Sequence, residues 1–341
     1  MRFAKFLIAS ILMLMLSIVP AISVFAVAEV ANMDIVNRYM RERNFTSSDG
    51  TPMPYRIYIP TDYDKNESYP LVIFFHGAGE IGSDNRKQVT YPYSIVTRLL
   101  TEENRENHEC IIIAPQAGGQ WVNTPWSEGN YTRSEIAESK YMTAAEELIQ
   151  SIKKSYSIDS DSVYATGVSI GGFAVWDIIS RHPDWFAAAI PVCGGADISY
   201  AEKLINMPIW TFHGSADTTV PVEGTREMAE AIKGAGSESI IYTEYENAGH
   251  NVWNMAYVED DLLEWLFSKT ISSHTQIPAA TKPQESSATE TSIVPVTSGT
   301  EPENSSDDIK TGYTGYVIAV IAGIAFGAVA YFIIKAKRKN R

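Results

Sequence analysis

The most regular feature of the chain is a series of short apolar runs separated by amphipathic stretches. Such runs, rich in Val, Ile and Phe, are typical of strands in a parallel sheet that is covered on both faces. We expect strands at Tyr55–Ile59, Leu71–Phe75, Ile111–Ala114, Ser162–Gly167, Ala188–Val192, Ile209–Phe212 and Ile240–Tyr245. Apolar residues recur at helical spacing in residues 144–155, 173–181, 225–233 and 260–268. The alternation predicts an α/β fold with a mostly parallel central sheet and helices on both faces, and a turn at Ser48-Asp49-Gly50 predicts an antiparallel edge formed by the first strands.

Two further apolar segments lie outside this alternation, near the ends of the chain. The first follows a basic start, runs from Phe6 to Val19 and is followed by Ala26-Val27-Ala28. This order is typical of a secretory signal peptide with its cleavage site, so we expect residues 1–28 to be removed. A retained N-terminal anchor is the alternative, although the run is short for a membrane span and ends at Pro20.

The second segment, residues 316–334, is uncharged and long enough for a membrane helix, and a basic tail follows at 335–341. Residues 272–312 are rich in Ser, Thr, Pro and Glu, which is the composition of a disordered stalk. The positive-inside rule places the basic tail in the cytoplasm. The sequence therefore predicts a single-pass protein of the cell membrane with its folded domain, residues 29–271, outside the cell.

A pentapeptide, Gly167-x-Ser169-x-Gly171, stands between the fourth expected strand and the helix that follows it. A serine hydroxyl is a weak nucleophile unless the backbone exposes it to a neighbouring base, and a sharp strand-to-helix turn does this. The glycines suit such a turn because a Cβ on either side of the serine would clash. Ser169 is therefore the candidate nucleophile, and an ordinary glycine-rich turn is the alternative.

Candidates for the base and the acid follow the serine in chain order. Asp217 stands in the loop after the sixth expected strand, and His250 stands in the loop after the seventh. In this arrangement a histidine takes the serine proton and a carboxylate orients the histidine. His213 is a second candidate for the base or for a group that supports it. Asp197 and Glu223 are rival candidates for the acid.

The second expected strand leads into a loop that reads His76-Gly-Ala78-Gly-Glu80. In hydrolases of this design, the loop after that strand and the residue after the nucleophile each offer a backbone N–H to the developing oxyanion. Here those donors belong to Ala78 and Ile170. Each such donor is worth roughly 3 kcal/mol in the transition state. An ordinary glycine turn is again the alternative.

Four segments together carry a resemblance to a known family. They read FFHGAGEIGSDN, YATGVSIGGFAVWDIISRHPDWFAAAIPVCGGAD, WTFHGSADTTVPVEGTREM and AGHNVWNMAYV. The chain resembles the α/β-hydrolase esterases that are grouped with feruloyl and acetylxylan esterases, polyhydroxybutyrate depolymerases and predicted peptidases. The resemblance implies a catalytic triad of Ser169, Asp217 and His250. It also implies that the Gly77-Ala78 turn forms part of the oxyanion hole.

The connection between the fifth and sixth expected strands is short. Residues 194–207 leave no room for a large lid domain, so we expect a site that is open to bulky substrates. Aromatic rings stack on sugars and phenolic groups, which makes the segment 116–141 a candidate substrate wall, with core packing as the rival use of its rings. This segment carries Trp121, Trp126 and Tyr131. The candidate substrate contacts are Glu80, Trp121, Trp126 and Trp253.

Charge and cysteine content narrow the choice of partners. The formal net charge is −14, and a surface of this sign repels nucleic acid. Cys110 and Cys193 fall at opposite ends of the expected sheet, so we expect two free thiols. The spacing of Cys and His residues does not resemble a metal site, and we expect no cofactor.

The sequence therefore predicts a monomeric, membrane-anchored serine carboxylesterase that forms an acyl-enzyme at Ser169 and acts on feruloyl or acetyl esters of plant polysaccharides. A serine peptidase on the same triad stays open, because both reactions pass through a tetrahedral oxyanion. A catalytically silent binding module at the cell surface is the third reading. The presence of Ser169, Asp217 and His250 in order argues against it.

Overall fold

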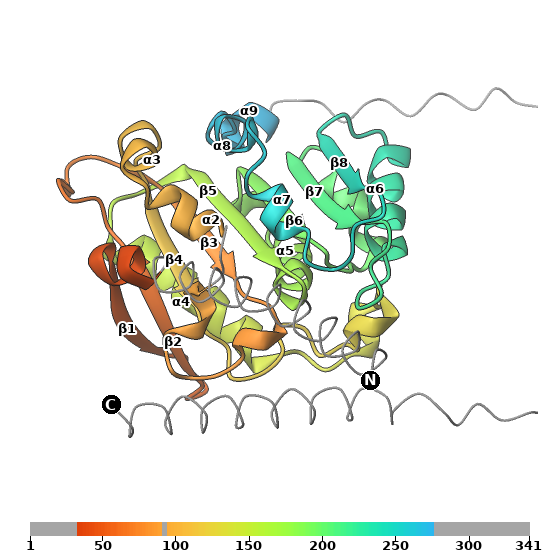
Figure 1. Cartoon of the computed structure of the whole chain (residues 1–341), viewed down its shortest axis with the longest axis horizontal. Coiled ribbons are helices and arrows are strands. Elements are labelled where there is room, and N and C mark those ends of the chain that lie inside the picture. Colours follow the sequence, from red (N-terminus) through yellow and green to blue (C-terminus); the bar gives the residue numbers. More distant parts are fainter. Residues whose placement is uncertain (1–32, 91–93, 276–341) are drawn as a thin grey trace, which may run out of the picture. The chain divides into compact units, whose positions relative to one another are not determined.

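The computed structural model describes residues 33–90 and 94–275 (Figure 1). The expected signal peptide, most of the expected stalk, the expected membrane span and the basic tail lie outside the described residues. Among the helices within 33–90 and 94–275, none combines the length and the apolar character that crossing a membrane requires.

An eight-stranded sheet forms the centre of the described region. Its strands are β1 (Met40–Thr46), β2 (Pro52–Tyr58), β3 (Tyr69–Phe75), β4 (Ile111–Pro115), β5 (Ile158–Val168), β6 (Ala188–Val192), β7 (Ile209–Gly214) and β8 (Ile240–Tyr245). Their order is β1-β2-β4-β3-β5-β6-β7-β8, and every pair from β4 onward is parallel. The α/β class and all seven expected strands are confirmed.

The antiparallel edge expected around Ser48-Asp49-Gly50 is the β1–β2 hairpin, which continues the sheet by an antiparallel pairing of β2 with β4. In its turn, the Asp49 carboxylate accepts hydrogen bonds from the Ser47 hydroxyl and from the Thr51 N–H. Gly50 has φ +85°, a conformation that only glycine adopts without strain. The turn chemistry explains why this edge could be predicted.

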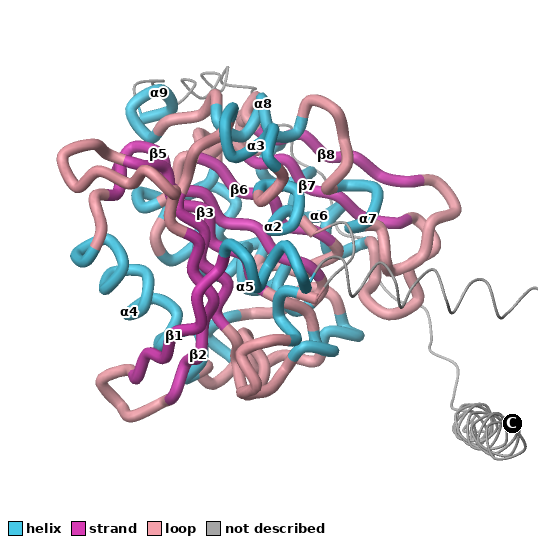
Figure 2. The backbone as a smooth tube through the Cα atoms, turned by 60° about the vertical axis from the view of Figure 1, so that its left-hand side comes forward, coloured by secondary structure: helices cyan, strands magenta, loops and turns pink. Residues whose placement is uncertain are grey.

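Helices cover both faces of the sheet (Figure 2). They are α2 (Ile95–Leu99), α3 (Glu102–Asn107), α4 (Lys140–Ser155), α5 (Ile170–Arg181), α6 (Glu223–Gly234), α7 (Trp253–Ala256), α8 (Leu262–Phe267) and α9 (Ile271–Thr275). Side chains of α4, α5 and α6 pack in one core layer, and those of α2, α7 and α8 pack in the other. The period of two along β3 separates the layers, since Ile73 belongs to the first and Val72 and Phe74 belong to the second.

The folded region extends further than expected, because α9 covers Ile271–Thr275, where the sequence predicts the start of a stalk. The N–H and hydroxyl of Ser272 donate to the Asp161 carboxylate at 2.7 and 2.6 Å. The His274 ring is buried, with Nε2 3.2 Å from the Phe186 carbonyl oxygen. These polar side chains resemble stalk residues by composition, yet each has a partner on the domain. Composition therefore placed the boundary too early.

Candidate active site

Ser169 lies between the last residue of β5 and the first residue of α5, at the carboxyl end of the sheet. Its φ is +57°, a left-handed conformation that residues with a Cβ rarely adopt. A Cβ on Gly171 would lie 2.1 Å from the Phe75 carbonyl oxygen, and a Cβ on Gly167 would lie 2.5 Å from the Gly171 carbonyl oxygen. The strained turn therefore requires both glycines of the pentapeptide.

The structure brings Ser169, His250 and Asp217 together. His250 Nε2 lies 2.9 Å from Ser169 Oγ, and His250 Nδ1 lies 2.7 Å from Asp217 Oδ2. Because a carboxylate oxygen accepts, Nδ1 carries the ring proton and Nε2 can accept the serine proton. The rival acid, Asp197, instead accepts hydrogen bonds from the N–H groups of Arg133 and Ser199.

The Asp217 side chain is completely buried and receives four hydrogen bonds. Oδ1 accepts from the N–H groups of Thr219 and Val220 at 2.8 and 3.0 Å, and Oδ2 accepts from His250 and from His213 Nε2 at 3.1 Å. Burial alone would raise the pKa of Asp217, but the hydrogen bonds from His213, His250 and Val220 more than offset it. The pKa of this carboxyl is therefore held well below its usual range.

The two expected oxyanion donors lie on adjoining segments. Ala78 is the first residue of the 3₁₀ helix η1 (Ala78–Glu80), and Ile170 is the first residue of α5. N–H groups in the first turn of a helix have no acceptor within that helix. The segments approach closely, because a Cβ on Gly171 would come within 2.8 Å of the His76 carbonyl oxygen. The arrangement suits a shared anion site next to Ser169.

His76 fixes the loop that carries Ala78. Its Nε2 accepts a hydrogen bond from the Ala117 N–H at 2.9 Å, and its Nδ1 lies 2.7 Å from the Gly77 carbonyl oxygen. Burial lowers the pKa of His76 to about 4, so the ring is neutral near pH 7 and Nδ1 is the donor. The neutral ring therefore ties the loop after β3 to the loop after β4.

Two aromatic residues of the expected substrate wall are core residues instead. Trp121 is fully buried, and its Nε1 donates to the His76 carbonyl oxygen at 3.0 Å. Tyr131 is also buried, and its hydroxyl donates to Asp177 Oδ1 at 3.0 Å. The expectation that they face substrate is therefore wrong, because each ring has an apolar environment and a polar partner inside the protein.

The other expected substrate contacts are accessible in part. Trp126, Glu80 and Trp253 are half-buried. The Trp253 ring lies perpendicular to the His250 ring, with 5.6 Å between the centroids, so it borders the Ser169 site directly. The Glu80 carbonyl oxygen accepts a hydrogen bond from the Gln116 amide at 3.0 Å.

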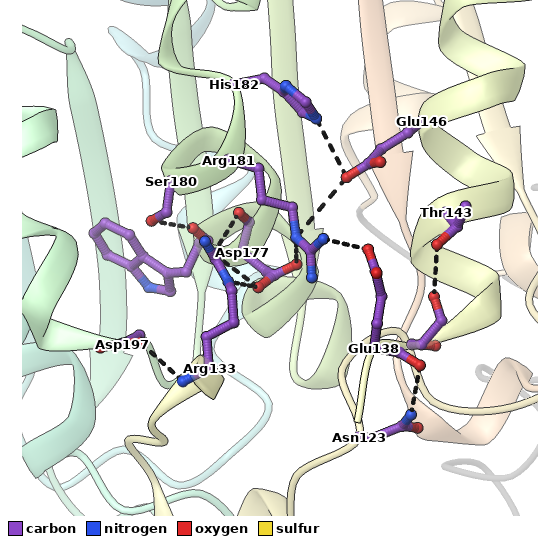
Figure 3. A network of polar contacts seen from close by, with 12 residues as sticks. Asn123, Arg133, Glu138, Thr143, Glu146, Asp177, Ser180, Arg181, His182 and Asp197 are labelled. Carbon is purple, nitrogen blue, oxygen red and sulfur yellow. Dashed lines mark hydrogen bonds and ion pairs between the residues drawn. The ribbon is translucent and has the colours of Figure 1, made fainter. Parts of the chain in front are cut away.

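A network of charged side chains around the buried Asp177 joins the segment 116–141 to α5 (Figure 3). Arg133 Nε and Arg181 Nε donate to the Asp177 carboxylate at 3.0 and 2.6 Å, and Arg181 also contacts Glu138 at 2.5 Å. The Asp177 side chain is 1% exposed. Burial alone would lower the pKa values of Arg133 and Arg181, but Asp177 more than offsets it and both are raised. A cavity of about 200 Å³ lies beside this network.

Sequence reasoning missed this network. Arg133 and Asp177 are 44 residues apart, and neither stands in a motif with a known chemistry. His213 was easier to find, because it lies near the end of β7, only four residues before Asp217. The difference is that a local motif shows its partners in the sequence, whereas a contact between distant segments does not.

Within the described residues, one group of side chains has the composition of a metal site. Ligand atoms of Cys193, His213 and Asp217 lie within 4.8 Å of one another. Cys193 Sγ, however, donates to the His250 carbonyl oxygen at 3.1 Å, and burial raises the pKa of this thiol well above its usual value. A thiol is a poor metal ligand until it loses its proton. The group is thus better explained as support for the His250 loop. Both Cys110 and Cys193 are free and buried, as expected.

Comparisons with known proteins show that this chain is similar to esterases. The model of a family described as "Esterase: Putative esterase" matches residues 46–233. "Probable feruloyl esterase C" of Aspergillus niger is 27% identical over 201 residues, which are 58% of this chain and 67% of that protein. "Dipeptidyl-peptidase 5" of Porphyromonas gingivalis is 30% identical over 157 residues, which are 45% of this chain and 21% of that protein.

A solved structure described as "Crystal Structure of a Thermostable Esterase" is 31% identical and superposes with a TM-score of 0.63. The superposition covers 69% of this chain and 64% of that one. The chain thus spans about a fifth of the dipeptidyl-peptidase and just under two thirds of the solved esterase.

Proposed function

The chain belongs to the esterase family, and on that premise we propose that it hydrolyses carboxylic esters through an acyl-enzyme formed at Ser169. The observation that carries the proposal is the relay from Ser169 Oγ through His250 to Asp217, with distances of 2.9 and 2.7 Å. A hydroxyl, an imidazole and a buried carboxylate in this order form a serine nucleophile activated by a base.

In acylation, Ser169 Oγ attacks the carbonyl carbon of the ester while its proton moves to His250 Nε2. Negative charge develops on the carbonyl oxygen, and the N–H groups of Ala78 and Ile170 stabilise it by donating hydrogen bonds. Collapse of this intermediate breaks the bond to the alcohol oxygen, which takes the proton from His250. The alcohol leaves, and the acyl group remains esterified to Ser169.

In deacylation, water attacks the acyl carbon and gives its proton to His250 Nε2. The second tetrahedral intermediate uses the same two N–H donors. Its collapse returns the proton to Ser169 Oγ and releases the carboxylic acid. Throughout both halves, the ionised Asp217 stabilises the imidazolium form of His250 and keeps Nδ1 as the donor.

We assign the substrate class as feruloyl or acetyl esters of plant polysaccharides. The similarity to a protein described as a feruloyl esterase supports this class. The short connection between β6 and β7, residues 193–208, favours a site that is open to a polymer. Trp253, beside His250, and the half-buried Trp126 offer rings for stacking on a sugar or a phenolic acyl group.

A second activity, peptide hydrolysis, is favoured by one observation, the 30% identity to a dipeptidyl-peptidase. The same relay can attack an amide. The two substrates differ in the leaving group, because an amine must be protonated by His250 before it departs, whereas an alcohol is a better leaving group. A panel of esters and peptide anilides separates the two functions.

We propose a cell-surface location for this activity, with the domain acting as a monomer. The support comes from the sequence alone: the expected signal peptide at 1–28, the stalk at 272–312 and the membrane span at 316–334 with its basic tail. Protease treatment of intact cells tests the location. Release of esterase activity into the medium is expected, and retention of all activity inside the cells would refute it.

The function is tested by Ser169→Ala, with Ser180→Ala as the matched control. Ser180 lies on α5, the helix that follows Ser169, and its hydroxyl donates to the Trp176 carbonyl oxygen at 2.7 Å. Both proteins are assayed on p-nitrophenyl acetate, methyl ferulate, acetylated xylan and peptide anilides. We expect Ser169→Ala to lose ester hydrolysis and Ser180→Ala to keep it. Retention of more than about a hundredth of kcat by Ser169→Ala would show that Ser169 is not the nucleophile.

A further inference from the structure

The carboxylate of Asp217 accepts hydrogen bonds from two histidines. Its Oδ2 lies 2.7 Å from His250 Nδ1 and 3.1 Å from His213 Nε2. His213 belongs to β7, and its side chain is completely buried. The catalytic mechanism proposed above uses only His250, so the second histidine needs a separate explanation.

Each nitrogen of His213 faces groups that accept hydrogen bonds. Nε2 lies 3.1 Å from Asp217 Oδ2 and 3.1 Å from the Val220 carbonyl oxygen. Nδ1 lies 2.8 Å from Thr225 Oγ1, and this hydroxyl lies 2.9 Å from the Gly194 carbonyl oxygen. Thr225 has one hydroxyl proton, and the carbonyl of Gly194 can only accept it. With that proton used, Thr225 Oγ1 is an acceptor towards His213.

A neutral His213 ring would break one of these contacts. If Nδ1 lacked a proton, Thr225 would have to donate to it, and the contact with the Gly194 carbonyl would lose its hydrogen. If Nε2 lacked a proton, the ring lone pair would face a carboxylate and a carbonyl at 3.1 Å. Only a ring with protons on both nitrogens satisfies all the acceptors around it.

We propose that His213 is a positioning residue, held as an imidazolium, that shares the charge of Asp217 with His250 and keeps His250 neutral to lower pH. This inference rests on the proposed roles of Ser169, His250 and Asp217. A permanent second cation on the carboxylate weakens its pull on a proton at His250, because both cations compete for one negative charge. The base then stays available in more acidic medium.

Other charges near His213 do not replace this effect. Glu244 of β8 lies close enough for its pKa to be lowered in part by His213, but its main partner is Arg226 of α6 at 2.5 and 2.8 Å. Cys193 approaches from the end of β6 as a thiol that donates to the His250 carbonyl oxygen. Among the hydrogen bonds that lower the pKa of Asp217, the bond from His213 is the largest.

The kinetic test compares His213→Gln with the wild-type full chain in a pH profile of kcat/KM on p-nitrophenyl acetate. Glutamine can still donate to Asp217 but carries no charge. We expect the midpoint of the acid limb to move upward by about 0.5 to 1 pH unit, the size of a modest charge interaction. The matched control, His274→Gln, changes another buried histidine whose Nε2 contacts the Phe186 carbonyl oxygen, and its midpoint should not move. An unchanged or lower midpoint in His213→Gln would overturn the proposal.

A direct test needs no activity and no stable His213 variant. The chain has six histidines, so the ring nitrogens of a ¹⁵N-histidine-labelled Ser169→Ala full chain can be resolved by NMR. We expect one ring, in contact with the Thr225 hydroxyl, to show two protonated nitrogens from pH 6 to pH 8. A neutral pattern for that ring would overturn the proposal. Esterase activity in the same Ser169→Ala sample would instead refute the proposed function, so the two failures are distinguishable.

Discussion

Two buried aspartates of this protein have similar surroundings and different roles. Asp177 on α5 is 1% exposed and accepts hydrogen bonds from Arg133 and Arg181. The side chain of Asp217, after β7, is 0% exposed and accepts hydrogen bonds from His213 and His250. Each carboxylate thus joins two cation-forming side chains from different segments of the chain.

The difference lies in whether a partner can release a proton. A guanidinium stays protonated at every pH at which proteins fold, so the Asp177 network is a fixed tie between the segment 116–141 and α5. An imidazole gains and loses a proton near neutral pH, so His250 can pass one to and from Ser169. A buried carboxylate is therefore structural beside arginines, whereas beside a histidine that faces a serine hydroxyl it can take the catalytic role that we propose for Asp217.

The largest expected effect is that of Asp217→Asn on turnover. We expect kcat to fall by roughly 10⁴, by analogy with the same change in a serine protease, because an amide neither stabilises the imidazolium nor enforces its tautomer. Steady-state kinetics on p-nitrophenyl acetate, with circular dichroism as the check on folding, measures the loss. Asp197→Asn is the control and should stay within about threefold of wild type. The reverse outcome would move the acid to Asp197.

Asp177→Asn should have the opposite profile. Removing the charge leaves Arg133 without its carboxylate partner and Arg181 with its contact to Glu138, which costs roughly 3 to 5 kcal/mol of unfolding free energy at a buried site. Urea denaturation measures this loss, and Asp184→Asn, an exposed carboxylate after α5, is the control. In the fraction that remains folded, kcat should change by less than about tenfold. A fall in kcat as large as that of Asp217→Asn would end the distinction between the two sites.

A third buried group, His76, tests the same rule with a ring whose nitrogens contact backbone groups only. The pKa of His76 is about 4 in the folded protein, and the ordinary value of a histidine, which we use for the unfolded chain, is 6.5. As the pH falls from 6.5 towards 4, the unfolded ring binds a proton that the folded ring does not, so stability decreases. Above pH 6.5 the ring is neutral in both states and takes nothing from the unfolding free energy. By pH 4, roughly 3 kcal/mol of the unfolding free energy is lost.

The measurement is urea denaturation of wild type and His76→Gln between pH 7 and pH 4.5. We expect the wild type to lose stability faster than the variant as the pH falls, so that their difference becomes smaller. Parallel curves would show that His76 does not titrate on unfolding. Such a result would be compatible with the hydrogen bonds of the ring to Gly77 and Ala117. It would contradict the lowered pKa of His76 in the folded protein.

The sequence predicted the parts of this molecule that depend on local patterns. The strands, the hairpin turn with Gly50 and the arrangement of Ser169 between two glycines all follow from residues that are neighbours in the chain. The pairing of Asp217 with His250 could be predicted because each stands at the end of a strand in a fixed chain order. These features leave a visible pattern because sheet geometry brings strand ends together.

What the sequence missed depends on contacts between distant segments. Trp121 could have lined the site or packed in the core, and its complete burial and its hydrogen bond to the His76 carbonyl oxygen decide between the two. The expected end of the domain at residue 271 was too early, because Ser272 donates a hydrogen bond to Asp161, which lies 111 residues away in the sequence. The Asp177 network has no motif for the same reason. Composition and periodicity carry no information about such pairs.

The smallest expected effect is that of Arg181→Lys, which tests the structural role of the Asp177 network. Arg181→Lys keeps a permanent cation near Asp177 but loses the planar group that contacts Asp177 at 2.6 Å and Glu138 at 2.5 Å together. A lysine can hold one of these partners well, so we expect a loss of about 1 kcal/mol in unfolding free energy, measured by urea denaturation. The loss should be the same at pH 7 and pH 9, because both cations stay charged in that range, and kcat should stay within about twofold of wild type. If kcat instead fell tenfold, α5 would transmit the geometry of Asp177 to the Ser169 turn. Asp177 and Asp217 would then both contribute to the geometry of the proposed active site.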